Sequence, residues 1–308
     1  MSVVVSAKGV EKKFGDFTAV KNTTLNIRQG ECFGLLGPNG AGKSTFINML
    51  YGVVRRTSGE LKIFHMDPNI ESRSIKKRVG VVTQENALDE SLTVWENMMI
   101  YAAFLSIPRE KRKDQIDSLL KFMNLDHKKE ANIRHLSGGM RRRLVFVRAL
   151  MGNPEFIVLD EPTTGLDPAV RHLLWGKVKE LKNRGCTILL TTHYMHEAEV
   201  LCDRLVIMNK GDVIAEGTPK ELINKYTPGY VAVYSAQKTT EEQINSLSTK
   251  KPNFLFSKDS TGFHLRAPTL KDLIDSRQEI TSEPDQIRPA NLEDVFLKTT
   301  GQELSADD

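Results

Sequence analysis

A glycine-rich segment near residue 40 has the residue types and the spacing of a phosphate-binding loop. It fits the pattern G-x-x-x-x-G-K-S/T at every specified position and reads Gly37-Pro38-Asn39-Gly40-Ala41-Gly42-Lys43-Ser44-Thr45. In such a loop, glycines let backbone N–H groups curl around phosphate oxygens, the following helix adds its positive end, and the lysine neutralises the β- and γ-phosphates. We expect this segment to bind a nucleoside triphosphate, with Ser44 holding Mg²⁺. The alternative is a glycine-rich turn that only ends a strand.

Two adjacent acids end an apolar run of strand length. Residues 156–159 are apolar and are followed directly by Asp160 and Glu161. Ligands of parallel sheets bind at the carboxyl ends of the strands, so both acids are expected beside the glycine-rich loop. We expect Asp160 to orient Mg²⁺, directly or through water, and Glu161 to polarise the water that attacks the γ-phosphate. The alternative is an acid pair that only begins a helix.

The flanking segments supply the strands and helices that would position these residues. Residues 31–36 have a buried-strand pattern that runs into the loop, and the apolar side chains of 46–50 recur at helical spacing. Beyond them, 156–159 and 186–190 are apolar runs separated by a helical segment around 170–181. Strands that alternate with helices predict a largely parallel sheet covered on both faces.

A β-rich start and a helical insertion surround this sheet. Residues 1–30 read as short strands and turns. From residue 93 to 107 the apolar spacing is helical, and Thr93 and Glu96 form a capping box in which each side chain satisfies a backbone N–H. The pattern stays mostly helical as far as Lys129.

The composition changes at the turn 226–229, which we take as a domain boundary. The segment beyond it mixes short strands with helices. Its last helix is expected over 292–300, capped by Asn291 and stopped by Gly301.

Composition and charge exclude several classes of protein. The chain has 308 residues, 40% of them hydrophobic and 27% charged, which excludes a disordered or fibrous chain. Its net charge of +4 is too weak to indicate nucleic acid as the main partner. The longest run without charged or strongly polar side chains, 98–105, is far shorter than the ~18 residues that span a bilayer, and no secretory signal is visible. We expect a cytosolic chain with three reduced cysteines.

A third motif distinguishes among families of nucleotide hydrolases. Leu136-Ser137-Gly138-Gly139-Met140 lies just before a helix that begins near Arg141. It resembles the signature of ATP-binding-cassette (ABC) ATPases, usually Leu-Ser-Gly-Gly-Gln, and departs from it only at Met140. Ser137 and Gly139 would form a second phosphate cradle at a helix start. Because one chain then carries two cradles for one γ-phosphate, a composite site between two chains is favoured.

The resemblance assigns roles to further residues. Gln84 resembles the loop glutamine that contacts Mg²⁺ and the attacking water, and Asp167 lies in what resembles the loop that crosses the dimer interface. His193 resembles the switch histidine that touches the γ-phosphate. Phe14 resembles the aromatic residue that stacks on adenine, with Phe17 as the competing candidate. Without the resemblance, each of these residues has an ordinary structural explanation.

The resemblance covers about residues 3–225 with every motif in order. It implies an α/β fold: a P-loop NTPase cassette with a RecA-like core, a β-rich N-terminal part and an α-helical subdomain at about 86–150. A small α+β accessory domain would follow at 226–308. Residues 288–296 look like the accessory tail of exporter ATPases related to daunorubicin-type drug and nodulation-factor systems.

The resemblance also implies partners and a location. We expect an ATPase subunit that dimerises around two ATP–Mg²⁺, drives a separate multi-spanning permease and lies at the cytoplasmic face of the membrane. A cytoplasmic helix of the permease would dock on the helical subdomain, whose candidate residues are Trp95, Met98, Met99, Tyr101 and Phe104. The alternative is that most of these residues pack internally.

Other functions stay open at this point. An ABC ATPase that acts on a soluble assembly is the main alternative, and a nucleotide binder without turnover is disfavoured because Glu161 and His193 are both present. The run Arg141-Arg142-Arg143 is interpreted as mainly solvated or interface charges, because consecutive helical residues point in different directions.

Overall fold

The computed structural model describes residues 2–83, 88–236, 239–240, 253–259, 262–276 and 283–301. The chain divides into two units, Met1–Glu216 and Gly217–Asp308. The turn 226–229 predicts a boundary after residue 225, whereas this division falls before helix α8 (Pro219–Tyr226). Within the described ranges, no helix is both long and apolar enough to cross a bilayer.

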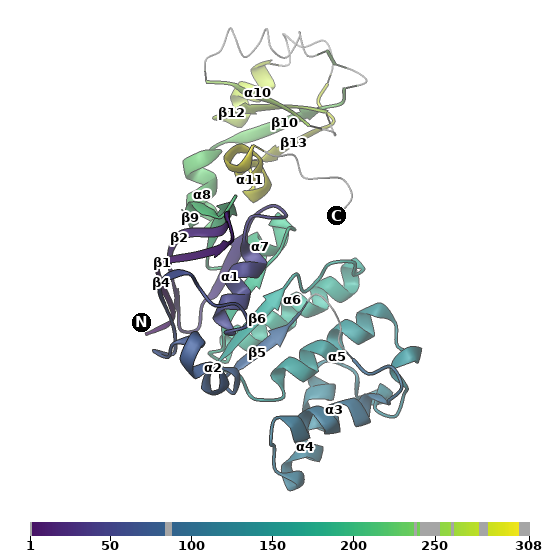
Figure 1. Ribbon diagram of the computed structural model, residues 1–308. Helices are drawn as coiled ribbons and strands as arrows, with labels where there is room; N and C mark the ends of the chain where they lie inside the picture. Colours follow the sequence, from purple (N-terminus) through teal and green to yellow (C-terminus); the bar gives the residue numbers. More distant parts are fainter. Residues whose placement is uncertain are drawn as a thin grey trace. The chain divides into compact units, whose positions relative to one another are not determined.

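A six-stranded sheet forms the centre of the first unit (Figure 1). In spatial order its strands are β5 (Val79–Val82), β6 (Phe156–Asp160), β7 (Thr187–Thr191), β3 (Cys32–Leu36), β8 (Arg204–Asn209) and β9 (Asp212–Gly217). The strands from β5 to β8 pair in parallel. β3 and β7 are buried along their whole length, as a sheet covered on both faces requires. The predicted parallel sheet is confirmed.

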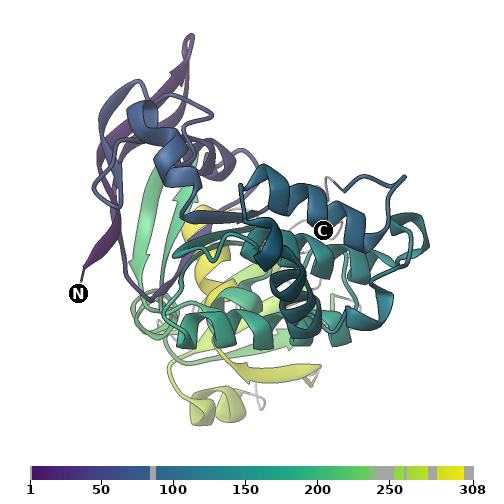
Figure 2. The same ribbon diagram turned by 90° about the horizontal axis from the view of Figure 1, so that it is seen from below.

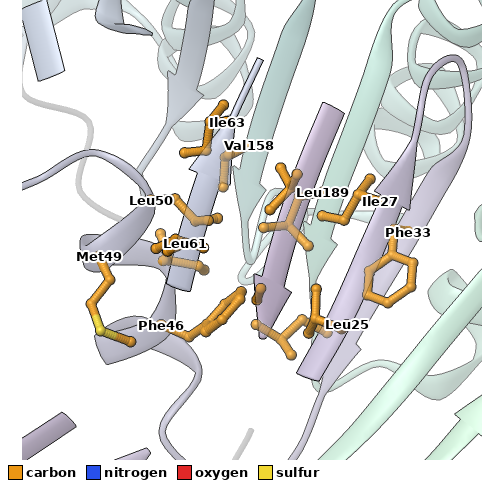
Figure 3. Close-up of a cluster of buried hydrophobic side chains, with 14 of the residues drawn as sticks. Leu25, Ile27, Phe33, Phe46, Met49, Leu50, Leu61, Ile63, Val158 and Leu189 are labelled. Carbon is orange, nitrogen blue, oxygen red and sulfur yellow. The ribbon is translucent and has the colours of Figure 1, made fainter. Parts of the chain in front are cut away.

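A second sheet packs with helix α1 (Lys43–Leu50) around one hydrophobic core. This sheet is antiparallel and consists of β2 (Phe17–Arg28), β1 (Val3–Phe14) and β4 (Ser58–Ile63). Figure 3 shows the core, to which β2, α1, β4 and the parallel sheet contribute Leu25, Ile27, Phe46, Met49, Leu50, Leu61, Ile63, Phe33, Val158 and Leu189. Helix α1 packs in this core together with both sheets. The end of the glycine-rich loop that enters α1 is therefore held firmly in place.

Helices α3 (Val94–Phe104), α4 (Arg109–Phe122) and α5 (Gly138–Leu150) form a group on the side of this unit away from β1, β2 and β4 (Figures 1 and 2). Short 3₁₀ turns at Asp126–Lys128 and Ile133–His135 connect α4 to α5. The predicted capping box is confirmed, because the Thr93 hydroxyl accepts the N–H of Glu96 at 3.2 Å and Glu96 accepts that of Thr93 at 2.8 Å. The unit also contains α2 (Pro68–Lys76), α6 (Pro168–Asn183) and α7 (Met195–Leu201).

The second unit is a four-stranded antiparallel sheet with helices. In spatial order its strands are β11 (Leu255–Asp259), β12 (Gly262–Ala267), β10 (Tyr230–Tyr234) and β13 (Gln286–Pro289). Its helices are α8, α10 (Leu270–Ser276) and α11 (Leu292–Thr300), and α11 packs against α8. The predicted last helix is confirmed, with Asn291 as its N-cap and Gly301 in the left-handed conformation at its end.

Asp294 is a fully buried carboxylate on α11. It accepts hydrogen bonds from Arg288 Nη1 at 2.6 Å, from Arg266 Nη2 at 3.3 Å and from the N–H of Asn291 at 2.9 Å. Burial by itself raises the pKa of Asp294, but the hydrogen bonds from Arg288 and Asn291 outweigh it and hold that pKa below its ordinary value. This ionic cluster ties α11 to β12 and β13.

We expect Asp294→Ala to destabilise the second unit by about 3 kcal/mol, because it leaves two largely buried guanidinium groups without their carboxylate. Hydrogen exchange in β10 and β12 should accelerate, with β6 of the first unit as the internal reference. Since the folded pKa is depressed, this stabilisation is complete above the unfolded pKa of ~3.9 and is lost as the pH falls through the folded value.

The matched control is Glu293→Ala, which removes an exposed acid from the same helical turn. It should leave the exchange rates of β10 and β12 unchanged. Native-like protection in Asp294→Ala would mean that the ionic cluster does not stabilise the unit.

Candidate nucleotide site

The glycine-rich loop joins β3 to α1, as predicted. Two of its glycines are required by close backbone approach: a Cβ on Gly37 would lie 2.4 Å from the carbonyl oxygen of Met208, and one on Gly42 would lie 2.3 Å from that of Ala19. The Lys43 side chain is buried, and its Nζ donates to the carbonyl oxygen of Gly37 at 2.6 Å. The ammonium group therefore lies against the inner backbone of the loop, where it can neutralise an anion that the loop holds.

The carboxyl ends of β6 and β7 bring Asp160, Glu161 and Thr191 together. Thr191 Oγ1 donates to Asp160 Oδ1, and the N–H of Glu161 donates to the carbonyl oxygen of Thr191 at 3.0 Å. Glu161 has φ of 46°, which is rare for a residue other than glycine. Backbone strain of this kind persists only where the surroundings impose it, so the position of Glu161 depends on its contacts with β7.

His193 follows β7 and faces Glu161. Its Nδ1 lies 3.4 Å from Glu161 Oε2, and both side chains are less than one-fifth exposed. The contact with His193 is the largest influence on the pKa of Glu161, which lies below its ordinary value; burial opposes this lowering, and Lys43 and Thr164 add to it. Glu161 is therefore a carboxylate at neutral pH and can accept a hydrogen bond from water.

Arg142 is buried beneath the segment that carries the two acids, and the interpretation of its charge as solvated was wrong. Its Nε donates to the carbonyl oxygen of Pro162 at 2.8 Å and its Nη2 to that of Glu161 at 2.8 Å. Further bonds reach the carbonyl oxygens of Asp160 and Thr83. Burial lowers the pKa of Arg142 to about 10, which leaves the guanidinium charged at neutral pH. Arg142 therefore fixes the backbone of Glu161 and of the residues beside it.

The sequence held a signal for this burial. Arg141 pairs with Glu90 at 2.8 Å, whereas Arg142 lies on the buried face of α5 with Val145 and Ala149. An arginine three and seven residues before apolar positions of one helix face is expected to point the same way as they do.

The signature residues lie at the start of α5. Ser137 is the N-cap, and its hydroxyl accepts a backbone N–H of the first turn at 3.3 Å; Ser137 and Gly138 are exposed. A Cβ on Gly139 would lie 3.1 Å from Val170 Cγ2, and the N–H of Val170 donates to Asp167 Oδ1 at 2.9 Å at the start of α6. The signature residues therefore lie close to the exposed Asp167. They form the N-terminus of α5, and helix N-termini attract anions.

Phe14 and Phe17 pair across the turn between β1 and β2. They are 50% and 64% exposed, and the Lys12 ammonium lies 4.5 Å from the centroid of the Phe14 ring. Both rings are available for stacking on a base. Gln84, the remaining predicted site residue, lies outside the described residues.

Comparison with known proteins identifies the family. Residues 20–164 match the family model described as ABC transporter. A Nod factor export ATP-binding protein I from Rhizobium sp. (strain N33) is 39% identical over 98% of this chain and 98% of its own length. The protein of the same name from Cupriavidus metallidurans is 40% identical over 99% of both chains.

Solved structures give the same assignment. A dimeric ATP-binding cassette in a post-hydrolysis state, bound to ADP and Pi, is 31% identical with a TM-score of 0.63, covering 70% of this chain and 98% of that one. The cbiO1 protein from Clostridium perfringens, part of the ABC transporter complex cbiONQ, is 25% identical with a TM-score of 0.68, covering 82% and 97%. The chain belongs to the ABC transporter family and is one of its ATP-binding, ATP-hydrolysing subunits.

Proposed function

We propose that this chain dimerises around ATP and Mg²⁺ and drives export through a separate multi-spanning membrane permease. The observation that carries the proposal is the contact between Glu161 and His193 at the carboxyl edge of the parallel sheet, on the edge that also carries the glycine-rich loop and Lys43. Relatives named as Nod factor export proteins, similar over nearly the whole chain, support export as the direction. The chain would then act at the cytoplasmic face of the membrane.

Each site residue has a defined task in this proposal. Residues 37–45 hold the triphosphate, and Lys43 neutralises its β- and γ-phosphates. Glu161 accepts the proton of the attacking water, and its lowered pKa keeps it in the basic form. His193 contacts the γ-phosphate and orients Glu161, and Phe14 stacks on the adenine.

Ser44 and Asp160 provide oxygen atoms of the kind that Mg²⁺ prefers. Ser44 is exposed in the first turn of α1, and Asp160 ends β6. The part of the chain that the structure describes contains no cluster of three or more His, Cys, Asp or Glu side chains suited to a metal. Mg²⁺ does not need one, because it keeps water and phosphate oxygens as ligands. Gln84 is a further proposed ligand, and the bound ion would offset the charge of the phosphates.

A second copy of the chain completes the site. The exposed Ser137 and Gly138 present the N-terminus of α5, which attracts anions. We infer that Ser137, Gly138 and Gly139 of one copy close on ATP held by the loop of the other, while Asp167 crosses the interface. The dimeric form of the related cassette supports this arrangement.

The proposed dock for a cytoplasmic helix of the permease lies on α3. Phe104 and Ile100 are 81% and 59% exposed, and Tyr101 stacks with Phe104 at 6.3 Å between ring centroids, whereas Met98 is buried. The exposed face suits an apolar helix. Pull-down in mild detergent tests whether the partner is a membrane permease. Recovery of a multi-spanning protein would support this, and recovery of ribosomes or a soluble scaffold would overturn it.

We expect Phe14→Ala to weaken ATP binding by about 1–3 kcal/mol, because a base loses its stacking surface. Titration with a fluorescent ATP analogue measures the effect. Phe17→Ala is the matched control, since it removes the same ring from the other side of the same turn. If only Phe17→Ala weakened binding, Phe17 would be the adenine platform.

We expect Glu161→Gln to reduce ATP hydrolysis by roughly 10²–10⁴-fold, because the amide cannot accept the proton. ATP binding should survive, so unhydrolysed ATP should hold two copies together. Gel filtration with ATP–Mg²⁺ should then show a dimer that is absent without nucleotide.

The control adds Ser137→Arg to Glu161→Gln. The bulky side chain would clash with the partner's phosphate, so the dimer should be lost while each monomer still binds ATP. Normal hydrolysis by Glu161→Gln would exclude Glu161 as the base. Persistence of the dimer in the double variant would contradict the composite site.

A further inference from the structure

We propose that Glu197 is a positioning residue that couples the loop carrying Asp167 to the segment carrying His193. This inference rests on the function proposed above and adds a residue to it. Glu197 lies on α7, four residues after His193, which precedes the helix, and its side chain is completely buried.

One carboxylate oxygen of Glu197 accepts hydrogen bonds from two different segments of the chain. Its Oε1 accepts hydrogen bonds from Thr163 Oγ1 and from Trp175 Nε1, both at 2.8 Å. Thr163 lies between Glu161 and Asp167, and Trp175 lies on α6, the helix that Asp167 caps. The carboxylate therefore anchors both the loop and the helix that follows it.

Burying a carboxylate costs free energy through desolvation, so packing alone does not explain why Glu197 occupies this position. Burial raises the pKa of Glu197, against hydrogen bonds from Thr192, Trp175 and Thr163 that favour the charged form. An apolar side chain of similar volume is often as stable in such a position. What an apolar side chain cannot do is fix the directions of the Thr163 hydroxyl and the Trp175 indole.

Two further contacts join α6 to α7 and its N-cap, those of Arg171 with Tyr194 and of Trp175 with His196, and others lie within α6 and the loop before it. The Arg171 guanidinium on α6 lies 4.5 Å from the centroid of the Tyr194 ring, next to His193, and donates to the carbonyl oxygen of Leu166 at 3.4 Å. The rings of His172 and His196 pack against Trp175 with centroids at 5.0 and 5.4 Å. A shift of the Asp167 loop is thus passed to α7 and to the histidine that faces Glu161.

The contacts of Glu197 predict an effect on the chemical step and not on nucleotide binding. None of its described hydrogen-bond partners belongs to the loop 37–45. Glu197→Ala should therefore lower kcat for ATP hydrolysis by ~10- to 100-fold, as expected for misplaced catalytic groups, with KM changed less than about twofold. Glu197→Gln should recover most of the rate, because its amide oxygen can accept both bonds.

Two further variants separate positioning from folding. Thr163→Val keeps the volume and removes only the hydroxyl on the loop side, so it should reproduce the loss of kcat, and Thr163→Ser should restore the rate. Glu199→Ala removes an exposed acid from the same helix and should match the native rate. These variants keep the inference testable if Glu197→Ala fails to fold.

Trp175 supplies a spectroscopic readout, because the chain has two tryptophans and Trp95→Phe leaves only this one. We expect ATP–Mg²⁺ to change the Trp175 emission in a Trp95→Phe/Glu161→Gln protein. The change should disappear when Thr163→Val is added, although the ATP-dependent dimer still forms.

The outcomes distinguish this inference from the proposed function. A native kcat in both Glu197→Ala and Thr163→Val, with active native protein, would overturn the role of Glu197 alone. So would equal losses of kcat and ATP affinity in the Ala and Gln variants, since these indicate a structural defect. If the native protein and Glu199→Ala both failed to hydrolyse ATP, the proposed function and this inference would fall together.

Discussion

The site depends on the hydrogen bonds that the buried guanidinium of Arg142 donates to backbone carbonyl oxygens. From its place on α5, Arg142 donates hydrogen bonds to carbonyl oxygens at and just after the end of β6. It also donates to the carbonyl oxygen of Thr83, which follows β5. A buried charge is stable only when its donors are satisfied, and here backbone oxygens do this. The same helix begins with the signature residues, so the side chain of Arg142 connects α5 directly to the backbone of Glu161.

Glu161 needs such support because its own backbone is strained. With φ of 46° it would relax if its neighbours allowed it, and the bonds to Thr191 and from Arg142 prevent this. Its carboxylate is then directed by His193 and Thr164. The proposed base is thus fixed from β7, from α5 and from the segment after β7, which suits a group whose task depends on its position more than on its basicity.

The sequence predicted those features whose causes are local. The glycine-rich loop, the capping box at Thr93 and the end of α11 at Gly301 each depend on a few consecutive residues, and the structure has all three. The sequence did not predict the roles of Arg142 and Glu197. The partners of Arg142 are 18 to 59 residues away along the chain, and Glu197 bonds Trp175 and Thr163, which are 22 and 34 residues away. The packing of α5 against β5 brings Arg142 to its partners, and the packing of α6 against α7 brings Glu197 to Trp175.

Electrostatics explain why two copies would associate only around nucleotide. Each copy contributes the positive start of α1 with Lys43 and the positive start of α5. In the proposed dimer these ends face each other, and without an anion between them they repel. A triphosphate places negative charge between the two cradles and turns the repulsion into attraction on both sides. In the proposed dimer, loss of the γ-phosphate would remove charge from the point where the second cradle closes, so hydrolysis would weaken the association and allow the cycle to reset.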